Sequence, residues 1–69
     1  MLASNIKRYR KKLNISQDKL SKLSDVTYNT IIKIESGKNK NPTMKTLAKI
    51  AEALGASLDD LVKGKNKKS

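Results

Sequence analysis

The chain has 69 residues and carries 16 lysines and arginines against 6 aspartates and glutamates, which gives a net charge of +10. It has no cysteine and no histidine, which excludes a disulfide and a thiolate metal site and removes the commonest general base. No apolar run reaches the roughly 18 residues needed to cross a membrane, and the first residues lack the pattern of a secretion signal. The net positive charge predicts a polyanionic binding partner. We expect the protein to be cytoplasmic, and to be associated with the nucleoid if the polyanion is DNA.

Hydrophobic periodicity predicts five short helices and no strand. The first helix spans about residues 3–13, because Ile6, Tyr9 and Leu13 recur at helical spacing along one face. Asn14 can adopt the left-handed conformation that ends a helix.

The next two helices are each about two turns long and are separated by a break at residues 24–27. Ser16 is the predicted N-cap of the first and Thr27 that of the second, because a hydroxyl oxygen there accepts a backbone N–H of the first turn. Gly37 is the stop signal after the second. We expect each helix to bury two apolar side chains, which are Leu20 and Leu23 in the first and Ile31 and Ile34 in the second.

The strongest amphipathic pattern predicts a fourth helix at residues 44–54, with Leu47, Ile50, Ala51 and Leu54 on its buried face. Thr43 can serve as its N-cap. Ser57 and Asp60 have capping-box spacing and predict a fifth helix at residues 58–62. Residues 63–69 are rich in lysine and have nothing to bury. We therefore expect one domain at residues 1–62 and a disordered basic tail at residues 63–69.

Residues 17–36 carry the strongest functional signal, because the second of these two short helices has a polar outer face with Tyr28, Asn29, Ile32 and Lys33. A two-turn helix is not stable alone, so its neighbours must hold it in place. An α-helix fits the major groove of duplex DNA, where Asn can hydrogen-bond adenine and Lys can reach guanine. Helix N-termini also offer free N–H groups to phosphates.

Several segments form one combined pattern: Ser16-Gln17-Asp18-Lys19-Leu20, Val26-Thr27, Ile31-x-x-Ile34-Glu35-Ser36-Gly37-Lys38, Pro42-Thr43, Leu47-x-x-Ile50-Ala51-x-x-Leu54-Gly55 and Ser57-Leu58-x-x-Leu61. Over roughly residues 4–62 this pattern resembles the phage-repressor and Cro-type helix-turn-helix regulators, the XRE family. The resemblance implies a compact, all-α, five-helix lambda-repressor-like domain. Its second and third helices would form the helix-turn-helix, with the third as recognition helix.

The resemblance also implies roles for individual residues. The implied contacts to DNA bases are Thr27, Tyr28, Asn29 and Lys33. The implied contacts to DNA phosphates are Ser16, Gln17, Ser36, Lys38 and Lys40. A structural ion pair is implied between Arg10 and Glu35. Two of the base contacts have alternatives: Tyr28 can instead pack over the helix start, and Lys33 can reach a phosphate.

Two residues depart from the family pattern, which usually has Ala at the position of Ser21 and Gly at that of Asp25. Asp tolerates left-handed geometry better than most residues, so we expect the turn to form.

A further cluster of basic residues lies on the first predicted helix and contains Lys7, Arg8, Lys11 and Lys12. We interpret this cluster as part of the electrostatic field around the groove, with no contact assigned to it.

These patterns predict a sequence-specific binder of a double-stranded DNA operator, a transcriptional repressor or autoregulator that is not an enzyme. No metal, cofactor, small molecule or membrane partner is expected. One recognition helix reads only a few base pairs, so we expect a homodimer on two half-sites about 34–36 Å apart. We expect the two copies to contact each other around Leu58, Leu61 and Val62, although these residues can equally serve only to cap the core. The alternatives are an antitoxin-type or other protein-interaction module, and charge-driven binding to RNA or a membrane surface.

Overall fold

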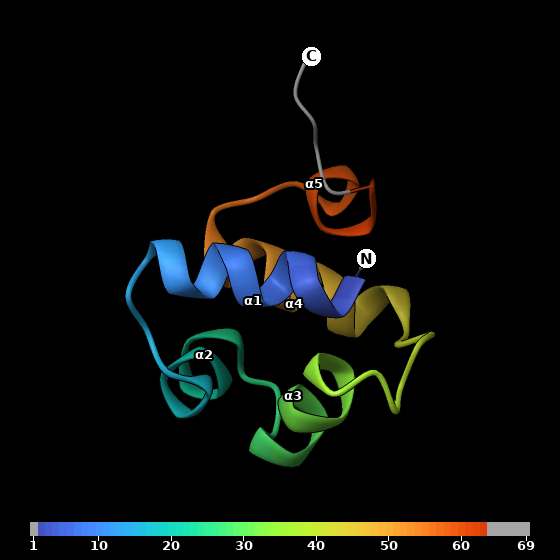
Figure 1. Ribbon diagram of the computed structural model, residues 1–69, viewed down its shortest axis with the longest axis horizontal. Coiled ribbons are helices and arrows are strands. Elements are labelled where there is room, and N and C mark those ends of the chain that lie inside the picture. Colours follow the sequence, from blue (N-terminus) through green and yellow to red (C-terminus); the bar gives the residue numbers. More distant parts are fainter. Residues whose placement is uncertain (1, 64–69) are drawn as a thin grey trace.

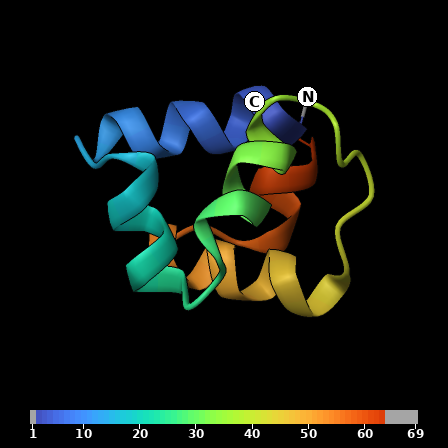
Figure 2. The same ribbon diagram turned by 90° about the horizontal axis from the view of Figure 1, so that it is seen from below.

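The computed structural model describes residues 2–63, which form five α-helices around one core (Figure 1). In chain order these are α1 (Leu2–Lys12), α2 (Gln17–Ser24), α3 (Tyr28–Glu35), α4 (Met44–Leu54) and α5 (Leu58–Lys63). Helices α1 and α4 run along opposite sides of the molecule, α2 and α3 form one face between them, and α5 closes the opposite end (Figure 2). The all-α order agrees with the sequence prediction. The predicted basic tail lies outside the described residues, apart from Lys63, which ends α5.

Every helix contributes at least one fully buried apolar side chain to the core. These side chains are Ile6, Leu20, Ile31, Ile34, Ile50 and Leu61. Because α2 and α3 have eight residues each and α5 has six, none of them is long enough to be stable without this shared core. The position of α3 is therefore set by the whole domain.

Two apolar residues predicted to face inward are exposed instead, which corrects the sequence reading. Leu13 is 49 % exposed because α1 ends before it and the chain turns at Asn14, whose φ is 59°. Leu23 is 52 % exposed, and Ser24 takes the buried place in the last turn of α2. The Ser24 hydroxyl is satisfied there, since it donates to the carbonyl of Leu20 at 2.7 Å.

The helix starts follow the predicted capping chemistry. The hydroxyls of Ser16, Thr27 and Thr43 each accept a backbone N–H three residues later, at 3.0, 3.3 and 3.1 Å. Ser57 and Asp60 form the reciprocal capping box at α5. Asp25 adopts φ 59° in the turn between α2 and α3, as expected for a residue in the place of a glycine.

Helix α5 is held on α1 by one buried side chain. The Asn5 amide donates to the Leu61 carbonyl at 2.7 Å and its oxygen accepts from Arg8 at 3.1 Å. The Leu61 side chain itself is fully buried, so its prediction as part of a dimer surface is wrong. Leu58 packs partly buried against the core, and Val62 is exposed.

None of the helices in residues 2–63 has both the length and the apolar character of a membrane span.

Candidate nucleic-acid interface

Helix α3 points its polar side away from the domain. Ile31 and Ile34 anchor the helix in the core, so Asn29 and Lys33 lie on the opposite, exposed side. Neither side chain has a hydrogen-bond or ion-pair partner among residues 2–63. The structure therefore leaves the amide and the ammonium group of these two residues available to a ligand.

The first turn of α3 holds the other two candidate base contacts. Thr27 uses its hydroxyl as the N-cap, accepting the N–H of Thr30 at 3.3 Å and lying 2.8 Å from the Thr30 hydroxyl. Its γ-methyl group is still free for an apolar contact. Tyr28 is 47 % exposed, so about half of its surface can meet a ligand.

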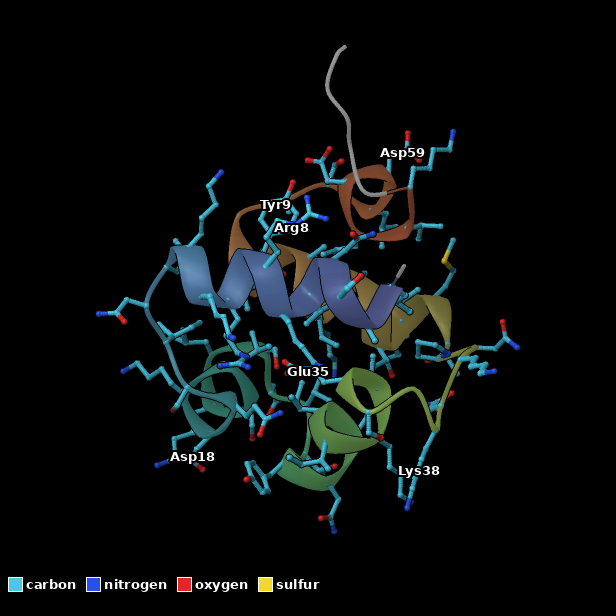
Figure 3. The ribbon with its side chains drawn as sticks, viewed as in Figure 1. Arg8, Tyr9, Asp18, Glu35, Lys38 and Asp59 are labelled. Carbon is cyan, nitrogen blue, oxygen red and sulfur yellow. The ribbon has the colours of Figure 1, made fainter. Side chains whose placement is uncertain are left out.

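A buried polar network fixes α3 against α1 and α2. Arg10 forms a two-point ion pair with Glu35, at 2.9 Å from Nε and 3.0 Å from Nη2, and its Nη1 donates to the Ile15 carbonyl at 3.0 Å. The side chains are 13 % and 2 % exposed, respectively. Glu35 lies beneath α1 in Figure 3, between that helix and α3. Such fork-to-fork geometry is directional, so the pair holds the angle between the helices.

Gln17 belongs to the same network, which the sequence reading missed. Its Nε2 donates to Glu35 Oε1 at 3.0 Å. The two residues are 18 positions apart, and no local pattern indicates the contact. An amide nitrogen carries two N–H donors, so one is held by Glu35 and the other is still available at the start of α2. The half-buried Gln17 side chain is thereby oriented before any ligand arrives.

The remaining candidate phosphate contacts lie on both sides of α3. Figure 2 shows α2 on one side and the loop of residues 37–42 on the other. Ser16 accepts the N–H of Lys19, which leaves its O–H free to donate. The Ser36 hydroxyl instead donates to the Lys33 carbonyl at 3.1 Å. This use does not favour Ser36 as a donor to phosphate.

The loop after α3 is anchored by its backbone. The Asn39 N–H donates to the Lys33 carbonyl at 3.0 Å, and the Asn39 side chain accepts the N–H of Asn41 at 3.1 Å. Lys38 and Lys40 flank this anchored residue and are exposed. Figure 3 shows Lys38 extending away from the domain at the level of α3. Two lysines are thus exposed beside the outer face of α3, on a loop held by these hydrogen bonds.

The arrangement is suited to docking and offers no catalytic set within residues 2–63. In that range no three acidic side chains come together in a way that could hold a metal ion. Asp18 pairs with Lys22 at 3.4 Å, and the oxygen of Asp25 lies 4.0 Å from Lys49. These surface contacts are of the kind that contributes little to stability.

Comparisons with known proteins agree with this geometry. Residues 6–61 match the family model described as helix-turn-helix. The chain is 37 % identical over 60 residues to an HTH-type transcriptional regulator of Archaeoglobus fulgidus, a match that covers 87 % of this chain and 83 % of that protein. It is also 37 % identical over 60 residues to an HTH-type transcriptional regulator of Methanocaldococcus jannaschii, with 87 % of this chain and 89 % of that protein covered.

Proposed function

We propose that this chain, which belongs to the Cro/C1-type helix-turn-helix family of non-enzymatic, DNA-binding transcriptional regulators, is a repressor that binds an operator sequence through α3. Bound at a promoter in the cytoplasm, it would exclude polymerase or a competing regulator, including at its own gene. The observation that carries the proposal is the outer face of α3. Its polar side chains are unpartnered, while its inner face is fixed by the core and the Arg10–Glu35 pair.

In this proposal α3 lies in the major groove and reads base edges. Asn29 would form two hydrogen bonds to an adenine, and Lys33 would donate to O6 or N7 of a guanine. Thr27 and Tyr28, in the first turn, would meet the neighbouring base pair, where the threonine methyl and the tyrosine ring suit a thymine methyl group. The preorganised helix supports this reading, because little conformational entropy is lost on binding.

Phosphate contacts on both sides of α3 would set the depth and register of the helix in the groove. Ser16 and the second amide N–H of Gln17 would donate to one strand. Lys38 and Lys40 would bind the other strand, while the Ser36 hydroxyl, which donates to the Lys33 carbonyl, is not assigned a phosphate. Backbone contacts of this kind supply affinity but carry no sequence information.

One copy reads only a few base pairs, so we infer that two copies bind a two-fold symmetric operator. With Leu61 in the core, the apolar contact between copies would use exposed Val62 and the exposed part of Leu58. The half-sites would then lie about 34–36 Å apart along one side of the duplex.

Selection of bound sites from a random duplex library tests the proposal. We expect enrichment of an inverted repeat with the spacing of one helical turn, and loss of preference at one base pair per half-site when Asn29→Ala is selected in parallel. Enrichment of no sequence, together with equal affinity for scrambled duplexes at matched salt, would overturn sequence-specific regulation and favour binding by charge alone.

A further inference from the structure

Helix α1 carries a second set of cations that the recognition face does not use. Four basic residues are exposed, and α1 contains no acidic residue. These are Lys7, Arg8, Lys11 and Lys12. Within residues 2–63 none of the four forms an ion pair, and Arg8 donates instead to the Asn5 amide oxygen. Like charges four residues apart destabilise a helix, so the arrangement is unfavourable for folding alone.

Two side-chain contacts fix how α1 is rotated about its axis. Arg10 points to Glu35 of α3, and Asn5 points to Leu61 of α5. At 3.6 residues per turn, Lys7 and Lys11 lie about 60° and 100° beyond Arg10 on the solvent side. By the same geometry Arg8 and Lys12 lie within about 60° of Asn5. Figure 3 agrees, because Arg8 extends from the side of α1 nearer α5, and Glu35 lies on the other side.

The four cations therefore form two pairs: Lys7 and Lys11 lie nearer the Arg10 side of α1, with Lys11 close to the middle of its solvent-facing side, and Arg8 and Lys12 lie nearer the Asn5 side. The Lys7–Lys11 edge borders the face formed by α2 and α3, where α1 runs along the margin (Figure 2). The Arg8–Lys12 edge borders α5, at the opposite end of the molecule. Each pair is spaced by four residues and carries two positive charges, so the two edges differ in position and not in charge.

We propose that the Lys7–Lys11 edge binds the phosphate backbone of the operator duplex outside the groove that holds α3, and that the Arg8–Lys12 edge does not touch this duplex. The inference rests on the proposed function and adds a contact surface to it. Packed helices lie about 8–10 Å apart, and the major groove is about 12 Å wide. When α3 occupies the groove, one bordering strand therefore runs close to α1.

The position of Lys11 along the chain supports the same strand. Lys11 is in the last turn of α1, and only residues 13–15 separate that helix from Ser16, the N-cap of α2. The Ile15 backbone N–H donates to the Arg10 carbonyl at 3.1 Å, which keeps this connection tight. A strand that accepts hydrogen bonds from Ser16 and Gln17 would continue past Lys11 and then Lys7.

The test compares two double variants of equal charge, Lys7→Gln with Lys11→Gln and Arg8→Gln with Lys12→Gln, on the selected operator over a range of salt concentrations. The first should reduce the slope of log affinity against log salt by about 1.8, since each phosphate contact contributes about 0.9. Its affinity deficit should be about tenfold larger at 50 mM salt than at 200 mM. The second should change the slope by less than about 0.5, and neither should change base preference.

Neutral methylphosphonates placed one at a time in the operator provide an independent readout. At the proposed phosphates they should weaken binding of the wild type and of the Arg8–Lys12 variant, but not of the Lys7–Lys11 variant. The inference would be overturned if the two double variants had equal salt slopes, or if no methylphosphonate position affected them differently. The proposed function would still stand in that case, provided that the wild type prefers a specific sequence. A wild type that prefers no sequence would overturn the proposed function and this inference together. Thermal melting should be nearly unchanged in the Lys7–Lys11 variant, because both side chains are exposed and neither forms an ion pair. The Arg8–Lys12 variant also loses the bond from Arg8 to the oxygen of buried Asn5, so binding is compared at a temperature at which melting shows both variants to be folded.

Discussion

Truncation of Glu35 is the most informative perturbation of this domain. The Glu35→Ala change removes a carboxylate that is 2 % exposed and that accepts from Arg10 and Gln17. It leaves a guanidinium that is only 13 % exposed without its counter-charge. Breaking a buried ion pair on one side costs about 3–5 kcal/mol. Because Arg10 keeps its bond to the Ile15 carbonyl and some contact with solvent, we expect about 3 kcal/mol, at the lower end of that range.

The assay is thermal and urea unfolding followed by circular dichroism. A loss of about 3 kcal/mol corresponds to a fall in Tm of about 12–24 °C for a domain of this size, and to a lower urea midpoint with an unchanged slope. Total stability for such a chain is about 3–10 kcal/mol. The variant should therefore be marginally folded at room temperature.

Two control variants separate the destabilisation caused by the unpaired Arg10 charge from that caused by the lost packing of the Glu35 side chain. Glu35→Gln keeps the shape and one acceptor but removes the charge, and should fall between wild type and Glu35→Ala. The double variant Arg10→Met with Glu35→Leu replaces both ions by apolar groups and should recover most of the loss. A Glu35→Ala variant within about 0.5 kcal/mol of wild type, or a double variant as unstable as the single one, would refute the reasoning.

Four further outcomes follow from the geometry. Asn29→Ala should weaken operator binding by about 1–3 kcal/mol and relax one base position; uniform weakening across sequences in a competition assay would argue against base contact. Lys40→Ala should lower affinity equally for all sequences and reduce the salt slope by about one unit, and an unchanged slope would speak against a phosphate contact. Asn5→Ala should cost about 1–3 kcal/mol in urea unfolding because it leaves the Leu61 carbonyl without its donor; a neutral result would show that water replaces the amide. Asp25→Gly should raise stability by less than about 1 kcal/mol, since φ is 59° there, and a loss of Tm would show that the carboxylate stabilises the turn.

The helices and their boundaries were predictable because their signals are local. A hydroxyl N-cap is recognised within four residues, and the apolar repeat of α4 within eleven. The caps at Ser16, Thr27 and Thr43 formed as the sequence indicates. The polar outer face of α3 also follows from periodicity, once Ile31 and Ile34 are assigned to the core.

The family resemblance implied the Arg10–Glu35 pair, which the structure shows, but the other side-chain contacts across the fold have no local signal. The bond from Gln17 to Glu35 spans 18 residues and the bond from Asn5 to Leu61 spans 56. Whether a polar residue is buried depends on the partner it finds, and that partner is set by the packed arrangement. Ser24 shows the same limit on a smaller scale. It is buried in the last turn of α2, where Leu23 was predicted to be, and its hydroxyl donates to the carbonyl of Leu20 in the preceding turn.

The distribution of acidic residues connects the fold to the proposed function. Between residues 26 and 51 the chain has one acidic residue, Glu35, and the fold buries it against Arg10. The outer face of α3 and its following loop therefore expose lysines and no acidic residue of their own. Exposed Glu52 and Asp59 lie at the end of α4 and in α5, away from this face. An asymmetric field of this kind orients a molecule as it approaches a polyanion. The buried carboxylate that holds the angle of α3 thus adds no negative charge to its outer face, and exposed Asp18 and Asp25, on α2 and in the turn before α3, each lie within 4.0 Å of a lysine.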